Sequence, residues 1–392
     1  MKAKAFAEYL IVTVAGMLFF WPPIWRAAWS TDYFRSDFPL HALFAEHMQA
    51  LGTITVPHFL YEGSAILLRS VFGGSITAAG AWIAVFAAGA TVTVVYAWLR
   101  KDFGIAPSAL CAFACALLAP LSLFTPHHLY FGYIGLTTYF NPTTILLKPL
   151  AFAHLACVIT LLTSDRHRRS LAVALFLLTV LTGIAKPHYL MCLLPGLAGY
   201  CAIRWNEIRK KMGVVLCSIV LPAAILLAWQ FAFVFIWGSS DYARSAFLFA
   251  PFAGMREHSL HLAPKLLASI ALPAAILWYH RRTVLHRAEL LLPLLLAIVG
   301  LLYSYLLVEA GERGGSMNFI RAGEISLFLL TVFAAVYHIR YLHTRYLDAR
   351  RPAERKWKFS WGQWAIAMLF LLSLVSGALL YAAEWSQPGR LL

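Results

Sequence analysis

The residues best suited to chemistry gather early in the chain, in the stretch STDYFRSDFPLHALFAEHM at positions 30–48. It contains Asp32, Asp37 and His41, although the 392-residue chain has only 17 acidic residues. A carboxylate can accept a proton from a hydroxyl group, and an imidazole can assist it. Asp37 and His41 are four residues apart, so a helix that includes both carries them on one face. We therefore expect a catalytic group here, with Asp37 first, Asp32 second and His41 in support.

Basic residues at the mouths of apolar runs form a second group. Lys148 lies in YFNPTTILLKP, and Lys186 lies in the short turn AKPHYLM. Arg313 and Arg321 both lie in EAGERGGSMNFIRAGE. Ionisable groups at the entrance of a membrane span are expensive and are often functional. Isolated cations near a carboxylate suit a substrate that has a phosphate group and a hydroxyl group to be deprotonated.

Each of these groups also has a structural interpretation. Asp37 could be a helix N-cap, and so could Asn141, which precedes a proline. His41 could be an interfacial polar residue, and the charges of residues 309–324 could form a network of ion pairs. The spacing of His, Asp and Glu matches no diagnostic metal motif, so no metal ligand is assigned and a divalent metal is left open.

Composition decides which elements position these side chains. The chain is 61% hydrophobic and only 12% charged, whereas an average soluble domain is about 25% charged. A span needs roughly 20 apolar residues, and the apolar runs here are continuous rather than alternating, as a β-barrel would require. We therefore predict an all-α polytopic membrane protein, one transmembrane domain over residues 1–392. The eleven expected spans are 7–25, 78–99, 107–124, 145–163, 170–185, 188–203, 213–237, 262–279, 288–308, 322–342 and 362–383.

Lys and Arg counts predict the orientation of these spans. With the N-terminus inside, 21 of the 32 basic residues lie in inner segments, as the positive-inside rule requires. The prediction is a multi-pass protein of the inner (plasma) membrane, with a cytoplasmic N-terminus and an extracytoplasmic C-terminus. The first outer loop, residues 26–77, is expected to form two amphipathic helices on the membrane surface, and residues 343–361 a basic inner loop. The fifth and sixth spans are short and could instead form one broken pair.

Several function classes lose support from the sequence. The six cysteines match no CxxC pattern and are read as small apolar helix residues. The chain contains no Walker motif and no GxGxxG, so ATP-driven transport has no support within it. The basic residues are scattered over loops, and therefore no nucleic-acid partner is expected; membrane lipid is the expected surroundings.

Three segments carry a family resemblance: TDYFRSDFPLHALF after the first span, YFNPTTILLKP, and ERGGSMNFIRAGE. Together with the long first outer loop, they resemble the GT-C superfamily of integral-membrane glycosyltransferases. The last two segments resemble uncharacterised bacterial proteins of cell-surface polysaccharide pathways. The chain departs from many family members in two ways, because its early acids are five residues apart and no large soluble C-terminal domain follows the spans.

The resemblance implies a polyprenyl-phosphate sugar donor, a cell-envelope glycan or lipid acceptor, and transfer on the extracytoplasmic side. It assigns the base to Asp37, with Asp32 second, and it implies no certain cofactor, with a divalent metal left open. The residues expected to hold the donor phosphate are Lys148, Lys186, Arg313 and Arg321. The residues expected to contact the sugar are Asn141, Tyr139, His188 and Asn318.

Three alternatives stay open. A transporter or flippase of lipid-linked saccharides would place ionisable groups deep in its spans, where only His154 is prominent here, and would show two similar halves, which this chain lacks. A polysaccharide polymerase or ligase usually has one dominant late outer loop, whereas the first loop is the longest here. A non-catalytic scaffold would not require acids and bases to gather on one side.

Overall fold

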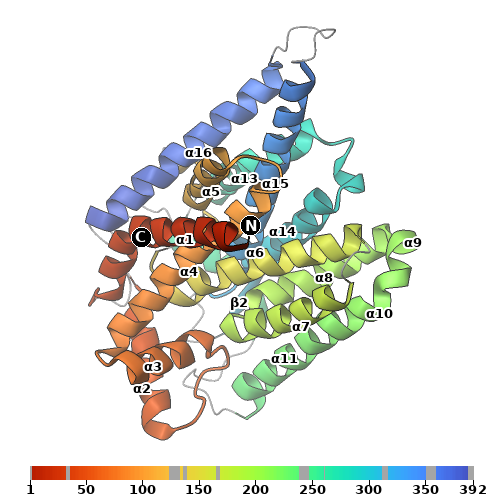
Figure 1. The fold of residues 1–392 in the computed structure, drawn as a ribbon. Helices are drawn as coiled ribbons and strands as arrows, with labels where there is room; N and C mark the ends of the chain where they lie inside the picture. The colour runs from red at the N-terminus through yellow and green to blue at the C-terminus, as the bar shows by residue number, and fades with distance from the viewer. Residues whose placement is uncertain are drawn as a thin grey trace.

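The computed structural model is almost entirely helical (Figure 1). The residues that it describes are 2–31, 36–122, 133–135, 139–164, 168–237, 247–259, 261–310, 317–349 and 359–386. The helices in chain order are α1 (Lys2–Ala28), α2 (Phe38–Leu51), α3 (Leu60–Phe72), α4 (Ile76–Leu99), α5 (Ile105–Leu117), α6 (Pro142–Thr163), α7 (Arg168–Ala185), α8 (His188–Ile203), α9 (Trp205–Ile208), η2 (Arg209–Lys211), α10 (Met212–Val215), η3 (Leu216–Val220), α11 (Leu221–Phe231), η4 (Ala232–Ile236), α12 (Ala253–His258), α13 (Leu262–Tyr279), η5 (Val284–His286), α14 (Ala288–Leu306), α15 (Ile320–Ala349) and α16 (Trp361–Ser386).

The helices confirm the predicted polytopic membrane architecture but not the count of eleven spans. Within the described residues, eight helices are long and apolar enough to cross a membrane. They are α1, α4, the run from α9 to η4, α13, α14, α15, α16 and α6. Three further apolar helices, α5, α7 and α8, coincide with predicted spans but are shorter, so length alone does not qualify them.

Two helices form in the segment that the sequence predicts to be the first outer loop, and two helices were expected there. They are α2 and α3, which follow α1 and precede α4, and they pack against each other and against α4. Ser75 begins α4 as an N-cap, because its hydroxyl accepts a hydrogen bond from the Ala78 amide at 3.1 Å. That α2 and α3 lie along the membrane surface stays a prediction.

The helix α15 is central, whereas α1 is peripheral. In the apolar window of α15, 72% of residues are buried, against 17% in α1. The N-terminal part of α15 packs closely on α14, since a Cβ added to Gly300 would lie 2.6 Å from the Ala322 carbonyl oxygen. Glycine at this position therefore lets the two backbones approach, and this contact fixes the entrance of α15, where Arg321 lies.

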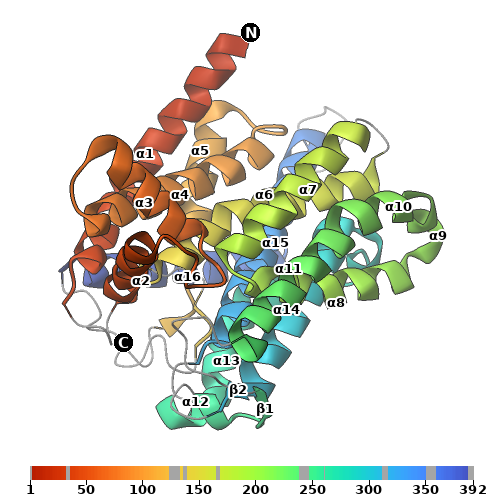
Figure 2. The same cartoon turned by 90° about the horizontal axis from the view of Figure 1, so that it is seen from below.

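Short strands and loops gather at one end of the molecule. Strands β1 (Phe247–Phe249) and β2 (Leu307–Glu309) pair antiparallel, with Phe247 opposite Glu309. Figure 2 shows this pair and α12 at the end of the bundle opposite the N-terminus. The start of α15 lies at the same end, because Ile320 lines a pocket together with residues of β2.

Candidate active site

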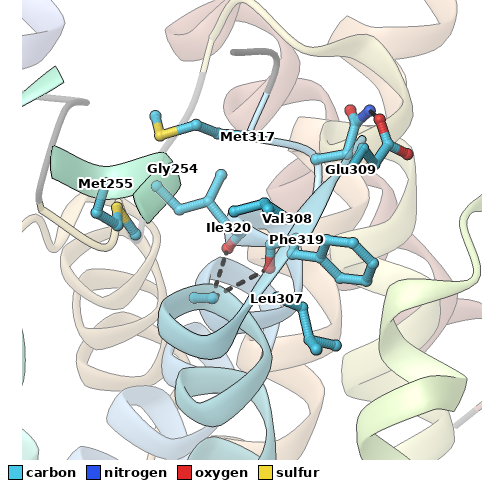
Figure 3. A pocket seen from close by; sticks show the side chains of 10 residues that line it. Gly254, Met255, Leu307, Val308, Glu309, Met317, Phe319 and Ile320 are labelled. Atoms are coloured by element: carbon cyan, nitrogen blue, oxygen red, sulfur yellow. Dashed lines mark hydrogen bonds between the residues drawn. The ribbon is translucent and has the colours of Figure 1, made fainter. Parts of the chain in front are cut away.

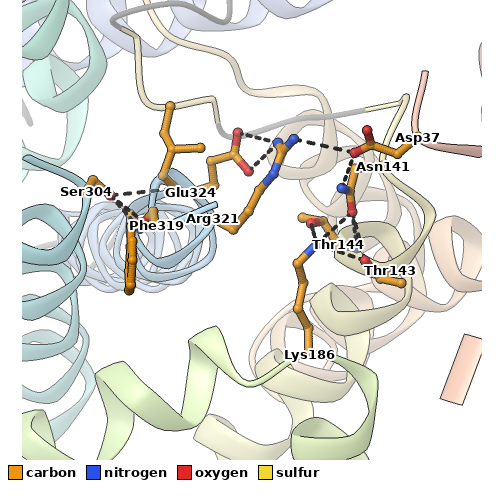
Figure 4. A network of polar contacts seen from close by, with 11 residues as sticks. Asp37, Asn141, Thr143, Thr144, Lys186, Ser304, Phe319, Arg321 and Glu324 are labelled. Atoms are coloured by element: carbon orange, nitrogen blue, oxygen red, sulfur yellow. Dashed lines mark hydrogen bonds and ion pairs between the residues drawn. The ribbon is translucent and has the colours of Figure 1, made fainter. Parts of the chain in front are cut away.

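Four chain segments that are far apart in the sequence meet in one polar network (Figure 4). Asp37 precedes α2, Asn141 precedes α6, Lys186 lies between α7 and α8, and Arg321 lies in the first turn of α15. Sequence reasoning singled out all four as site residues. The network joins them through side-chain contacts, so one acid, one amide and two cations share a single site.

Asn141 is the centre of this network. Its Oδ1 accepts hydrogen bonds from the Thr144 amide at 2.8 Å, the Thr143 hydroxyl at 3.0 Å and Lys186 Nζ at 3.0 Å. Its Nδ2 donates to Asp37 Oδ2. The residue is therefore both the N-cap that the sequence suggested and a bridge between a cation and a carboxylate.

Asp37 is not a side-chain cap, so that alternative is wrong. It occupies the position before α2, but its φ of −80° and ψ of −9° are helical, whereas a capping side chain needs an extended backbone to reach the first-turn amides. The nearby hydroxyl of Ser36 accepts from the Phe38 amide at 3.3 Å instead. The carboxylate of Asp37 is left to contact Asn141 and, at 3.6 Å, Arg321.

Lys186 is a buried cation held by neutral oxygens. Its side chain is 6% exposed, and its ammonium donates to Asn141 Oδ1, to Thr143 Oγ1 at 2.8 Å and to Thr144 Oγ1 at 3.2 Å. Burial, together with the nearby Arg321 charge, lowers the pKa of Lys186 to about 7. The Lys186 side chain therefore loses its proton near physiological pH, and an added negative charge nearby would stabilise its charged ammonium form.

Arg321 bridges two carboxylates. Its Nη1 lies 3.0 Å from both oxygens of Glu324, one turn along α15, and its Nη2 faces Asp37. The guanidinium also lies over the ring of Phe140, 5.0 Å from its centroid. Glu324 is 2% exposed, so it acts as a fixed internal counter-ion.

The remaining predicted phosphate ligands divide into two groups. Lys148, in the second turn of α6, is buried, lies 5.2 Å from the centroid of the Phe328 ring, and interacts electrostatically with Glu324. It therefore borders the network through Glu324. Arg313 lies outside the described residues, as does Asp32, the second predicted acid.

The structure pairs His41 with a different acid from the one expected. Its Nδ1 lies 2.5 Å from Glu62 Oε1 on α3, so the described contacts place His41 beside Glu62 rather than beside the Asp37 carboxylate. Helical spacing correctly put His41 one turn after Asp37, but it gave no information on the partner from another helix. Assistance of Asp37 by His41 stays a prediction.

The other predicted sugar ligands have the following places and contacts. His188 is the first residue of α8, and the Asn318 amide donates to Glu309 Oε2 at 2.8 Å. Tyr139 is buried with its ring near Phe20, and its hydroxyl has no hydrogen-bond partner among the described residues. Their contact with a sugar stays a prediction.

A small pocket lies beside the segment that leads to Arg321 (Figure 3). Glu309 and Asn318 form its polar edge. Met317, which lines it, has a φ of +48°, and Phe252, just before α12, has a φ of +64°, a left-handed conformation that is uncommon for such residues. The residues that line the pocket are Gly254, Met255, Ser304, Leu307, Val308, Glu309, Met317, Asn318, Phe319 and Ile320.

Four residues of this region were not assigned to the site from the sequence. Thr143 and Thr144 hold Lys186, Glu324 holds Arg321, and Glu62 holds His41. The spacing of Arg321 and Glu324 by three residues in a helix was an available signal. The other three depend on contacts between helices, for which the sequence carried no comparable signal.

Carboxylates in this region are paired with nitrogen donors. The described residues bring together no group of three His, Cys, Asp or Glu side chains that could hold a metal ion. Asp37 contacts an amide and a guanidinium, and Glu62 contacts an imidazole. A divalent cation at Asp37 would have to compete with Arg321.

Comparisons with known proteins add a likeness of fold. No family model and no curated protein sequence matches the chain. The crystal structure of ArnT from Cupriavidus metallidurans bound to undecaprenyl phosphate aligns over 97% of this chain and 77% of its own, with a TM-score of 0.52 and 15% identity. The archaeal oligosaccharyltransferase AglB from Archaeoglobus fulgidus, in complex with an inhibitory peptide and a dolichol-phosphate, aligns over 97% of this chain and 56% of its own, with a TM-score of 0.45 and 13% identity. The chain therefore shares its fold with ArnT, a likeness that agrees with the fold the sequence resemblance predicted.

Proposed function

We propose that the protein is a glycosyltransferase that moves a sugar from a polyprenyl-phosphate donor to a cell-envelope glycan or lipid on the extracytoplasmic side of the membrane. One observation carries the proposal: Asp37 is joined to Lys186 through Asn141 and faces Arg321 directly. The site thus combines a proton acceptor with two cations. The fold likeness to ArnT, whose structure contains undecaprenyl phosphate, supports the choice of donor.

Lys186 and Arg321 are suited to a phosphate group because their present partners can be replaced. All three hydrogen bonds of Lys186 end on side-chain oxygens. Arg321 shares its guanidinium between two carboxylates, at 3.0 Å and 3.6 Å. A phosphate brings acceptor oxygens with full negative charge, and charge-assisted hydrogen bonds are about twice as strong as neutral ones. Both cations can therefore turn to a donor phosphate and stabilise it as it leaves.

A series of aromatic rings gives the lipid tail of the donor a route to this site. Phe231 is exposed, and its ring centroid lies 5.0 Å from that of Phe235. Phe247 follows at 4.7 Å and Phe319 at a further 5.4 Å. Phe319 precedes Arg321 by two residues. An isoprenoid chain that covers the exposed rings of Phe231 and Phe247 buries apolar surface, while its phosphate reaches the cations beyond the buried Phe319.

The proposed reaction is a displacement at the anomeric carbon of the sugar. The acceptor hydroxyl oxygen forms a bond to this carbon, and its proton passes to the carboxylate of Asp37. The bond between the carbon and the phosphate oxygen breaks, and the electron pair leaves with the polyprenyl phosphate. Lys186 and Arg321 stabilise the charge that develops on that oxygen. Asn141, through its Nδ2, keeps the Asp37 carboxylate turned toward the site.

The test is release of free polyprenyl phosphate from a panel of polyprenyl-phosphate sugars by the protein in nanodiscs, with cell-envelope lipids as acceptors. Wild type should release it, and Asp37→Asn should lower the rate by about 100-fold or more, the usual contribution of a positioned base. Glu46→Gln is the matched control, because Glu46 is an exposed acid of α2. Full activity of Asp37→Asn would move the base elsewhere, and no release from any donor would contradict the transferase proposal.

The alternative of a transporter or flippase receives no support from His154. Its ring is fully buried within α6. One ring nitrogen lies 2.8 Å from the Tyr189 hydroxyl, and the other lies 2.9 Å from the Thr179 hydroxyl. Both nitrogens are thus satisfied by hydroxyl groups that fix the packing of α6, α7 and α8. A histidine so held has a structural role that needs no proton transport.

A further inference from the structure

Glu62 is a buried acid at the candidate site to which the proposed mechanism gives no task. It lies in the first turn of α3 and is 0% exposed. Its Oε1 contacts His41 Nδ1 at 2.5 Å, whereas its Oε2 has no hydrogen-bond partner among the described residues. A buried carboxylate with an unsatisfied oxygen costs stability, so its retention calls for a reason other than packing.

The segment that carries Glu62 is fixed by contacts with α4 and α7. The neighbouring Tyr61 packs against Gly80 of α4, where an added Cβ would lie 2.2 Å from the tyrosine hydroxyl oxygen. The loop before α3 is tied to α7, because Gln230 Nε2 donates to the Pro57 carbonyl at 3.0 Å and to the Gly183 carbonyl at 2.9 Å.

The second of these bonds depends on a proline. In a continuing helix, the Gly183 carbonyl would accept from the amide of residue 187, four positions on. That residue is Pro187, which has no N–H. Gln230 supplies the missing donor and uses it to join the α3 loop to the end of α7. Glu62 and Lys186 therefore sit on segments that one side chain holds together.

Charged and titratable groups on several elements interact electrostatically with Lys186. They are Asp37 before α2, Glu62 on α3, Arg321 and Glu324 on α15, and His188 at the start of α8. Arg321 is already shared by two of the three carboxylates, Asp37 and Glu324. Glu62 contacts an imidazole, not a permanent cation. Of these three carboxylates, Glu62 is thus the one whose negative charge is not compensated by Arg321.

We propose that Glu62 is a positioning residue of the candidate site, which acts on the donor phosphate through Lys186. His41 fixes the buried carboxylate, and the field of the carboxylate keeps the lysine ammonium charged for phosphate binding. The inference rests on the proposed function, because it assumes that Lys186 binds the phosphate of a lipid carrier. It assigns to His41 a role in holding Glu62.

The sign of the effect follows from the charges. Burial and Arg321 lower the pKa of Lys186 to about 7, while the carboxylates, Glu62 among them, raise it. Removal of the Glu62 charge should therefore lower the lysine pKa further. The ammonium would be lost at a lower pH, and phosphate binding with it.

The experiment measures binding of undecaprenyl phosphate to the full-length protein in nanodiscs as a function of pH. Glu62→Gln keeps the shape of the side chain and a hydrogen bond to His41 but removes the charge. Its binding profile should move to lower pH, because the lost carboxylate charge is one of those that raise the pKa of Lys186. Glu62→Asp should restore the wild-type profile in part, and Glu46→Gln, which changes an exposed acid of α2, should leave it unmoved.

The outcomes separate this inference from the proposed function. Wild type that binds no undecaprenyl phosphate at any pH contradicts the proposed function itself. Wild-type binding with a Glu62→Gln profile at the same pH overturns the role of Glu62 alone. Weaker binding of Glu62→Gln by the same factor at every pH, together with a lower unfolding temperature, would show a purely structural residue and would also overturn it.

Discussion

Asn141 caps α6 and also joins Lys186 to Asp37, and substitution can separate these tasks. Asn141→Ala removes the cap, which is worth about 1 kcal/mol. It also removes an acceptor of a charged hydrogen bond from buried Lys186, which is worth about 1.5–3 kcal/mol. We expect the free energy of unfolding to fall by about 2.5–4 kcal/mol, with Thr143 and Thr144 as the remaining acceptors of the ammonium.

Asn141→Ser keeps an oxygen that can cap α6 and loses the Nδ2 donor to Asp37. Stability should recover by about 1 kcal/mol relative to the alanine variant. The transfer rate should not recover, because the Asp37 carboxylate loses the amide that orients it. A hydrogen bond to a charged group of about 1.5–3 kcal/mol corresponds to a fall in rate of about 10- to 100-fold.

Two assays and one control test this reasoning. Unfolding in mixed micelles gives the stability, and release of polyprenyl phosphate in nanodiscs gives the rate. Ser75→Ala is the control, because Ser75 caps α4 through the Ala78 amide and takes no part in the network; it should lose about 1 kcal/mol and no activity. The reasoning is refuted if Asn141→Ala is no less stable than Ser75→Ala, or if Asn141→Ser transfers sugar at the wild-type rate.

Further predictions follow from single residues. Binding of undecaprenyl phosphate to wild type should weaken as the pH rises through about 7, since burial and Arg321 lower the pKa of Lys186 to that value and only the ammonium binds. An affinity that stays unchanged up to about pH 9 would contradict this prediction. Arg321→Lys keeps the charge but cannot bridge Asp37 and Glu324, so the transfer rate should fall about tenfold, and an unchanged rate would reduce Arg321 to a simple charge. Gly377→Ala should lower stability by about 3 kcal/mol or more, since its Cβ would meet the Leu117 carbonyl oxygen at 1.6 Å, whereas Gly213→Ala, in open space, should raise it by up to about 1 kcal/mol; equal unfolding curves for the two variants would be the contrary result.

The helices could be predicted because their signal is local. A continuous apolar run is enough to predict α4 or α16, because in a membrane the backbone N–H and C=O groups must bond to each other, as they do in a helix. Ionisable groups at helix mouths are equally visible and point to Lys186 and Arg321, whereas Asp37 is visible because acidic residues gather in the stretch 30–48. The three shorter helices show the limit of such reasoning, because apolar character alone did not reveal that α5 ends at Leu117.

The pairing of side chains could not be predicted, because it depends on contacts between distant segments. His41 was matched with Asp37 by its spacing along one helix, yet the structure matches it with Glu62 across the α2–α3 pair. The alternative of a side-chain cap at Asp37 is wrong for a backbone reason, its helical φ and ψ, which residue type does not reveal. The role of Gln230 likewise could not be predicted, because its two acceptors, the carbonyls of Pro57 and Gly183, are far from it in the sequence.

Two lysines beside helix ends show why residue type alone does not identify a site. Lys211 is 8% exposed, and its ammonium donates to the carbonyl oxygens of Leu161, Leu162 and Ser164 at the end of α6, at 2.9–3.2 Å. The last carbonyl groups of a helix lack an amide partner within that helix, so displacing the lysine would remove a hydrogen bond from each of these three. Lys186 is buried to a similar degree, but its three acceptors are side-chain oxygens, and two of them are hydroxyls that can also donate a hydrogen bond. An incoming phosphate can accept from the ammonium and from these hydroxyls together, and therefore Lys186 can exchange its partners for an anion while Lys211 cannot.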